Sequence, residues 1–246
     1  MLLHLAHPFQ HLELLSLLLL WVLFLFGGFL FGKTDAERIR RMPTWTRLAS
    51  SGTLLLAAWS CSLFTQDTPL STFSLLIAIG MTLGCLGDLL LAELVPLPQP
   101  VLGGMAAFGL GHIAYIVALL LVGNLQHLTA PAARLGAWSA WLLIGLLGWY
   151  FLVFRSHTPT PLHWAALPYA LLLASTAGFA TGLALQDSTF LLLALGTALF
   201  LLSDLILAAQ LFNNLHFPLI GDVIWLTYGP GQMFIVYTLG RALLLG

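Results

Sequence analysis

The sequence predicts an all-α protein, a polytopic membrane bundle of about eight transmembrane helices. Hydrophobic residues make up 60% of the 246 residues and charged residues only 7%, and the mean hydropathy is +0.99. Soluble domains carry about 25% charged residues, so this chain lacks the polar side chains needed to cover a water-exposed surface. The apolar residues also fall into long runs. We therefore expect one transmembrane domain over residues 1–246, with short loops.

A helix needs about 20 largely apolar residues to cross the hydrocarbon core of a bilayer. The runs in this chain are too long and too continuously apolar to be the alternating strands of a membrane barrel. In chain order, we expect helices at residues 12–31, 48–64, 70–94, 101–122, 135–154, 162–185, 189–212 and 219–245.

Features between and within the runs support this division. No basic residue precedes the first run and no small-residue cleavage site follows it, so we expect a retained helix rather than a signal peptide. Residues 96–100 and 158–161 are short and proline-rich, as is typical of turns between helices. Pro168 lies inside the sixth run, where we expect a kink.

The basic residues predict the orientation. Six lie on one side of the expected membrane, and only Arg134 and Arg241 lie on the other. Cytoplasmic loops carry the excess of lysine and arginine, so we expect the first loop in the cytoplasm, in a multi-pass protein of a bacterial inner membrane. The net charge of −1 gives no indication of nucleic-acid binding. The six residues are Lys33, Arg38, Arg40, Arg41, Arg47 and Arg155.

Two nearly identical segments carry an acid inside an apolar run. Asp88-Leu-Leu-Leu-Ala lies in the third run, and Asp204-Leu-Ile-Leu-Ala lies in the seventh. An ionised carboxylate in hydrocarbon costs a few kcal/mol or more, so intramembrane acids usually mark a functional site. The helix after each acid carries Gly-x-Gly followed by His112 or by Gln232. These matches predict a parallel internal repeat, which would place the two acids at equal depth and facing one another.

Both acids are expected toward the C-terminal ends of their helices. Asp88 lies 18 residues after Leu70, or about 27 Å along a helix. Asp204 lies 15 residues after Thr189, or about 22 Å. This is one or two turns inside the cytoplasmic interface, near the level of a phospholipid's glycerol backbone. Two facing carboxylates would share a proton and so provide a neutral acid and a charged base together.

Further polar residues lie at helical spacing near these acids. His112 and Tyr115 are three residues apart, and Tyr228 and Gln232 are four apart, so each pair shares one helix face. Tyr169 follows the proline of the sixth run. Such groups need hydrogen-bond partners in hydrocarbon, and the two acids could provide them. The alternative interpretation is that they only pack and link helices.

Other polar features are assigned simpler roles. Glu93 and Asp222 lie near helix ends and are expected at the interface. The basic first loop is expected to set the topology and to touch anionic headgroups. The motifs of zinc proteases, dithiol redox enzymes, serine hydrolases and P-loop nucleotide-binding proteins do not occur in the sequence.

An ordered set of residues from the third run to the eighth resembles the lysoplasmalogenase family of membrane proteins, also called YhhN-like. The first two runs carry none of the resemblance, and Gly229-Pro230-Gly231 departs from the bulkier residues expected before Gln232. The matching pieces are Gly87-Asp88-Leu-Leu-Leu-Ala, Phe108-x-x-Gly111-His112-x-x-Tyr115, Pro168-Tyr169, Gly196-x-x-x-Phe200-x-x-Ser203-Asp204-x-x-x-Ala208, and Thr227-Tyr228 with Gln232.

The resemblance implies a hydrolase that cleaves the sn-1 vinyl ether bond of a lysoplasmalogen, giving a fatty aldehyde and glycerophospho-ethanolamine or glycerophospho-choline. It implies that Asp88 and Asp204 are essential, and that no metal or organic cofactor is needed. One acid would protonate the vinyl ether and the other would act as base or stabiliser, with either assignment open. The expected partners are a lysophospholipid substrate and membrane lipids. The residues expected to bind or orient the substrate are His112, Tyr115, Tyr169, Ser203, Tyr228 and Gln232.

Two other functions remain open at the level of sequence. A proton-coupled transporter or channel also uses intramembrane acids and repeats. A lipid-binding or scaffold protein would use the acids only to hold helices together.

Overall fold

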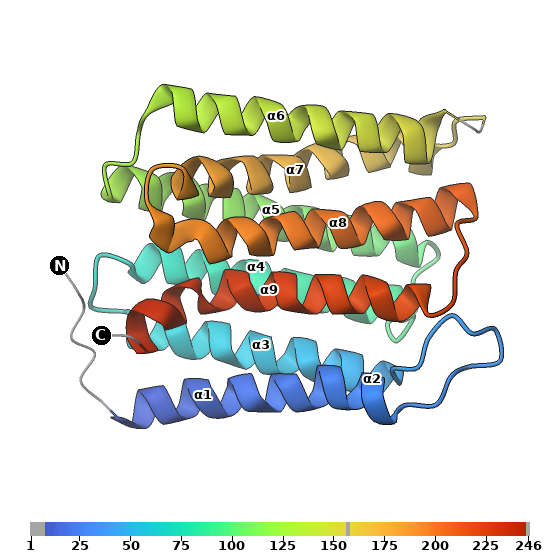
Figure 1. Cartoon of the computed structure of the whole chain (residues 1–246), viewed down its shortest axis with the longest axis horizontal. Coiled ribbons are helices and arrows are strands. Elements are labelled where there is room, and N and C mark those ends of the chain that lie inside the picture. The colour runs from blue at the N-terminus through green and yellow to red at the C-terminus, as the bar shows by residue number, and fades with distance from the viewer. Residues whose placement is uncertain (1–7, 156–157, 245–246) are drawn as a thin grey trace.

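The computed structural model describes residues 8–155 and 158–244, and in these ranges the chain is helical with no strand (Figure 1). Eight long helical segments lie side by side. Each expected helix is present, and each boundary falls within four residues of the expected position. The segments are α1 (Pro8–Val22), which continues through a π turn into α2 (Gly28–Phe31), α3 (Thr44–Phe64), α4 (Ser71–Leu91), α5 (Pro100–Leu125), α6 (Pro131–Trp149) with a π turn to Phe154, α7 (Pro161–Ala184), α8 (Leu191–Asn213) after a short 3-10 turn, and α9 (Ile220–Leu244).

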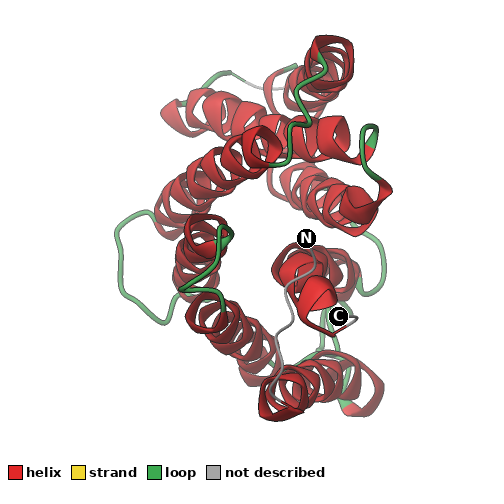
Figure 2. Ribbon diagram, turned by 90° about the vertical axis from the view of Figure 1, so that its left-hand side faces the viewer, coloured by secondary structure: helices red, strands yellow, loops and turns green. Residues whose placement is uncertain are grey.

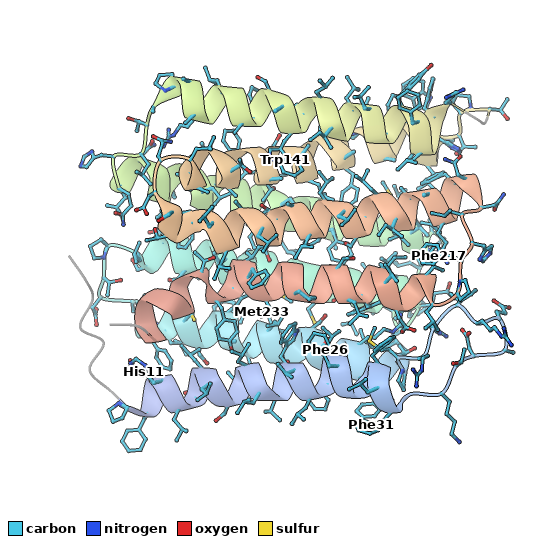
Figure 3. The ribbon with its side chains drawn as sticks, in the orientation of Figure 1. His11, Phe26, Phe31, Trp141, Phe217 and Met233 are labelled. Carbon is cyan, nitrogen blue, oxygen red and sulfur yellow. The ribbon has the colours of Figure 1, made fainter. Side chains whose placement is uncertain are left out.

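The bundle has the surface of a multi-pass membrane protein. Six helical segments of the described chain are long and apolar enough to cross a bilayer. Large apolar side chains point away from the bundle, as Figure 3 shows for Phe31, which is 88% exposed. Such a surface is stable against lipid, where outward-facing apolar groups carry no hydration cost. α3 is more polar, but Ser50, Ser51 and Thr53 are turned inward and buried.

Helices that follow one another in the chain form antiparallel pairs, and further contacts join these pairs to one another. α4 packs on α5, α6 on α7, and α8 on α9, while α1 covers α3. In addition α3 contacts α9, and α7 contacts α5. Figure 2 shows the bundle along the helix axes, from the end where α1 begins and α9 ends. The helices α3–α5 can be compared as one unit with α7–α9 as a second. The first helix of each unit then packs against the last helix of the other: α3 against α9, and α7 against α5. A parallel two-fold repeat produces this arrangement.

Two glycine pairs occupy matching positions in these units. A Cβ on Gly111 of α5 would lie 3.0 Å from the carbonyl oxygen of Gly80 in α4. A Cβ on Gly231 of α9 would lie 2.9 Å from the carbonyl oxygen of Gly196 in α8. Gly80 and Gly196 each precede the acid of their helix by eight residues. Small residues let membrane helices approach closely, so the second glycine of each Gly-x-Gly segment brings its helix against the one that carries the acid.

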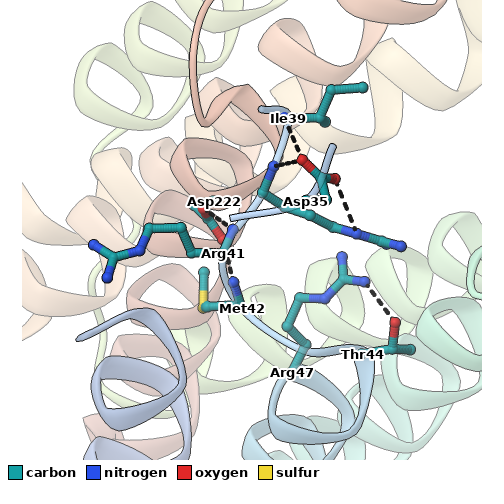
Figure 4. A network of polar contacts seen from close by, with 8 residues as sticks. Asp35, Ile39, Arg41, Met42, Thr44, Arg47 and Asp222 are labelled. Atoms are coloured by element: carbon teal, nitrogen blue, oxygen red, sulfur yellow. Dashed lines mark hydrogen bonds and ion pairs between the residues drawn. The ribbon is translucent and has the colours of Figure 1, made fainter. Parts of the chain in front are cut away.

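The first loop is fixed to the start of α9. Asp222 accepts hydrogen bonds from the backbone N–H groups of Arg41 at 2.5 Å and Met42 at 2.9 Å (Figure 4). The N–H of Leu219 donates to the carbonyl oxygen of Arg38 at 2.8 Å. Asp222 was expected near a helix end at the interface, and it lies in the first turn of α9. It is only 1% exposed, because the first loop folds back over this helix end and covers the carboxylate.

Candidate active site

Asp88 lies near the C-terminal end of α4 and is 4% exposed. Its Oδ2 accepts hydrogen bonds from the hydroxyl of Ser51 in α3 at 2.5 Å and from the hydroxyl of Tyr228 in α9 at 3.0 Å. A hydrogen bond to a charged group contributes about 1.5–3 kcal/mol, which offsets part of the lost hydration. One carboxylate therefore links α3, α4 and α9.

Asp204 occupies the corresponding position in α8 and is less buried than Asp88. The hydroxyl of Tyr169 in α7 donates to its Oδ2. Ser203 lies 3.3 Å from its Oδ1 but also donates to the carbonyl oxygen of Phe200 at 2.7 Å. A hydroxyl has one proton to donate, so Tyr169 is the main donor. In each unit the carboxylate is thus held by a hydroxyl from the preceding long helix, α3 or α7.

Both carboxylates line one cavity of about 530 Å³. It lies at the end of the bundle that carries the first loop, because its walls come from the C-terminal ends of α4, α6 and α8 and the N-terminal ends of α3, α5, α7 and α9. Its lining combines charged and polar residues with apolar ones. The polar lining includes Arg40, Arg47, Glu93 and Gln210, and the apolar lining includes Phe108, Trp149, Leu173, Leu201 and Leu207.

The partners of the two acids lie at similar depth. Ser51 is seven residues past the start of α3, Tyr228 is eight past the start of α9, and Tyr169 is eight past the start of α7. At 1.5 Å per residue, these hydroxyls are about 10–12 Å from the helix starts. These hydroxyls therefore lie about two helical turns inside this end of the bundle.

Tyr115 and Gln232 lie outside the cavity lining and act on Asp88 through Tyr228. The hydroxyl of Tyr115 donates to Oε1 of Gln232 at 3.0 Å. Nε2 of Gln232 lies 3.4 Å from the hydroxyl oxygen of Tyr228 and donates to it. With its oxygen accepting from Gln232, Tyr228 directs its own proton to Asp88. The chain of donors therefore runs from α5 through α9 to the carboxylate.

His112 is not brought into contact with either acid. Its Nδ1 lies 2.9 Å from Oγ1 of Thr176 in α7, and its ring meets that of Phe200 edge-on at 4.5 Å between centroids. Thr176 donates its own proton to the carbonyl oxygen of Leu172, so Nδ1 is the donor to Thr176. The structure makes His112 a link between α5 and α7. Of the other expected site residues, Tyr169, Ser203 and Tyr228 line the cavity with the acids.

Three residues at the site were not identified from the sequence. Ser51 donates to Asp88, and Arg47 and Trp225 line the same cavity. Arg47 was assigned to the first loop, but α3 begins four residues earlier than expected, after Pro43 in extended conformation, so that Arg47 lies in its first turn. Ser51 could have been identified from the polar stretch 50–53, which lies inside an apolar run, with Arg47 one turn before it.

Within the described ranges, no group of three or more histidine, cysteine, aspartate or glutamate side chains is arranged to hold a metal ion. The polar groups at the site are carboxylates, hydroxyls, the amide of Gln210 and the guanidinium groups of Arg40 and Arg47. These groups can transfer protons and stabilise charge.

A protein-family model matches the part of the chain that contains the site. No curated protein and no solved structure matches the chain. The model of the YhhN family matches residues 44–239, which begin with α3 and include both carboxylates and all of their partners. The match covers most of the chain and leaves out only α1, α2, the first loop and the C-terminal residues, so this membrane protein belongs to the YhhN family.

Proposed function

We propose that this protein is a membrane hydrolase that cleaves the sn-1 vinyl ether bond of lysoplasmalogens. The products would be a fatty aldehyde and glycerophospho-ethanolamine or glycerophospho-choline. The observation that carries the proposal is the pair of carboxylates, on separate helices, lining one cavity with both polar and apolar walls. Membership of the YhhN family and the resemblance to lysoplasmalogenases support the choice of reaction.

The reaction needs an acid and a base in a water-poor site. A neutral carboxyl group first protonates the carbon of the vinyl group that is not bonded to oxygen, which leaves an oxocarbenium ion on the other carbon. Water adds to that carbon and loses a proton to a carboxylate, forming a hemiacetal. The hemiacetal collapses to the aldehyde and the glycerol hydroxyl. Glycosidases place two carboxylates around a similar oxocarbenium-like state.

Asp88 and Asp204 are the two groups proposed for these steps. Both donors of Asp88 fall on Oδ2, so Oδ1 receives no donor among the described contacts. The remaining oxygen can take part in proton transfer, while the bonds from Ser51 and Tyr228 fix its direction. Tyr169 fixes Asp204 in the same way. A negative carboxylate beside an oxocarbenium ion stabilises it strongly when water is excluded.

The shape of the cavity also supports a lipid substrate. Its volume of about 530 Å³ lies within the roughly 300–1,000 Å³ typical of small-molecule sites. The charged lining suits a headgroup, and the lining by Leu173, Leu201 and Leu207 suits the start of an alkyl chain. A transporter needs access from both ends of the bundle, whereas this cavity draws its walls from one end. Entry from one end is all that a lipid hydrolase requires, whereas a transporter would also have to open the acids to the opposite end in turn.

The direct test is release of fatty aldehyde from lysoplasmenyl-ethanolamine by the purified full chain in detergent. We expect activity in the wild type and a loss of about a hundredfold or more in Asp88→Asn and Asp204→Asn, as for removal of a general acid or base. Asp67→Asn is the matched control, because Asp67 is exposed at the opposite end of the bundle.

Full activity in either folded cavity variant would refute the acid and base pair. The saturated 1-O-alkyl analogue should not be cleaved, because it has no double bond to protonate. A wild type that cleaves no vinyl-ether lipid, but drives ion-dependent flux in liposomes, would instead identify a transporter.

A further inference from the structure

Arg47 is a cation held at the cavity wall with most of its donors unused. Its Nη2 donates to Oγ1 of Thr44 at 3.1 Å (Figure 4). Its guanidinium lies over the ring of Trp225, at 5.3 Å from the centroid. Its Nε is buried and has no hydrogen-bond partner in the part of the chain that the structure describes. A guanidinium has five N–H donors, so this group is fixed in place with capacity for a ligand.

The acids near Arg47 are engaged elsewhere. Asp222 accepts from the backbone of Arg41 and Met42, and Asp88 accepts from two hydroxyls. Among the described residues, no carboxylate lies within ion-pair distance of Arg47. Loss of hydration around an unpaired charge is costly, and an anionic ligand in the cavity would compensate for it.

The position of Arg47 suggests which anion. Arg47 and Ser51 are four residues apart on α3, one turn on the same face, and therefore about 6 Å apart along the axis. On α9, Trp225 and Tyr228 form the matching step, with ring centroids 5.2 Å apart. Nearer the starts of α3 and α9, the guanidinium of Arg47 lies on Trp225. About one turn deeper, the hydroxyls of Ser51 and Tyr228 bind Asp88.

A lysophospholipid has a similar spacing. Its sn-1 oxygen and its phosphorus are separated by five bonds, or roughly 6 Å when extended, given the roughly 3.5 Å that three backbone bonds span. Arginine matches phosphate oxygens with paired N–H donors. With the sn-1 oxygen beside Asp88, the phosphate would reach Arg47.

We propose that Arg47, braced by Thr44 and Trp225, binds the phosphate group of a lysophospholipid and so sets the depth of its sn-1 bond. This inference rests on the proposed function for the identity of the lipid, but phosphate binding itself can be measured without any cleavage.

The test uses lipids that cannot be hydrolysed by vinyl-ether chemistry. Binding of 1-O-alkyl lysophosphoethanolamine, of 1-O-alkylglycerol and of inorganic phosphate is measured by titration calorimetry on the purified full chain. We expect the wild type to bind the phosphate-bearing lipid at least tenfold more tightly than either other probe. In Arg47→Gln, affinity for that lipid should fall roughly tenfold to a hundredfold, while affinity for 1-O-alkylglycerol stays unchanged.

Two further variants test whether a loss of affinity in Arg47→Gln comes from the lost phosphate contact, rather than from misfolding or from the change in net charge. Arg47→Lys keeps the charge without the planar fork, and we expect an intermediate loss of affinity for the phosphate-bearing lipid. Arg155→Gln removes a positive charge from the same end of the bundle, where Arg155 is exposed and outside the cavity lining, and it should bind all probes as the wild type does. Unchanged affinity in Arg47→Gln, or an equal loss for the lipid without phosphate, would overturn the proposal. So would inorganic phosphate binding as tightly as the lipid.

Failure of this inference is distinguishable from failure of the proposed function. If vinyl-ether lipids are cleaved but phosphate brings no gain in binding, the reaction stands and the phosphate site is refuted. If phosphate-bearing lipid binds through Arg47 but no vinyl ether is cleaved, the site stands and the reaction is refuted.

Discussion

The hydroxyl of Tyr228 in α9 donates a hydrogen bond to the carboxylate of Asp88 in α4, with 3.0 Å between the two oxygens. The two residues are 140 positions apart in the chain. The same hydroxyl oxygen accepts from Gln232 one turn along α9, while the tyrosine donates its own proton to the acid. This contact joins the two halves of the bundle at the proposed reaction centre.

Replacing Tyr228 with phenylalanine should lower aldehyde release without unfolding the protein. The change removes one of the two donors to Asp88, and a hydrogen bond to a charged group corresponds to roughly a tenfold to hundredfold effect. The measurement is initial rate on lysoplasmenyl-ethanolamine. The matched control is Tyr237→Phe, which removes a buried hydroxyl of the same helix that donates to the carbonyl oxygen of Leu14. Equal rates in the two variants would contradict a role for the Tyr228 contact.

Gln232→Leu should lower activity only through Tyr228. In the wild-type background we expect a loss smaller than that of Tyr228→Phe, together with a stability loss of about 1–3 kcal/mol, because the buried hydroxyl of Tyr115 loses its acceptor. In the Tyr228→Phe background the same change should reduce activity little further, as in a double-mutant cycle for coupled residues. Additive losses of activity would show that Gln232 acts by another route.

The close glycine pairs predict a loss of stability on adding a methyl group. In Gly111→Ala and Gly231→Ala the new Cβ would lie 3.0 Å and 2.9 Å from a backbone oxygen, tighter than ordinary contact. We expect each to lower the free energy of unfolding by about 1–3 kcal/mol, as for overpacking, and to lower the midpoint of thermal unfolding in detergent. Gly136→Ala serves as control, since no atom lies within 4 Å of its added Cβ, and it should not destabilise.

Asp222→Ala should loosen the first loop. Two backbone N–H groups, of Arg41 and Met42, lose their acceptor. Trypsin cleaves after lysine and arginine, so we expect it to cut within residues 33–41 faster in the variant than in the wild type. The rate is measured by gel electrophoresis, and the cleavage sites are identified by mass spectrometry. Asp187→Ala is the control, because Asp187 accepts from a backbone N–H of Thr189 at the other end of the bundle. Unchanged cleavage in Asp222→Ala would mean that other contacts hold the loop.

The helices could be predicted from the sequence because each is a local property. An apolar run of sufficient length must be helical in lipid, where every backbone group needs an internal partner. The prolines and glycines between runs then limit the boundaries to within a few residues. Asp88 and Asp204 could be identified by the same reasoning, because an acid in such a run is conspicuous on its own.

The partners of the acids could not be found in this way. Ser51 and Thr53 look equivalent in the sequence, yet only Ser51 donates to Asp88, because the rotation of α3 turns it toward α4. His112 was expected beside the acids as a residue that orients the substrate, yet its Nδ1 donates to Thr176 in α7.

The sequence by itself determined the class of the protein, the number of its helices and the two acids proposed for its site, since hydropathy and the cost of a buried charge can be evaluated residue by residue. Only the tertiary structure decided which hydroxyl serves which acid, that Asp222 anchors a loop, and that Arg47 faces the same cavity. These depend on the rotation and approach of helices distant in the chain, and the close packing at Gly80 with Gly111 and at Gly196 with Gly231 helps to set that approach.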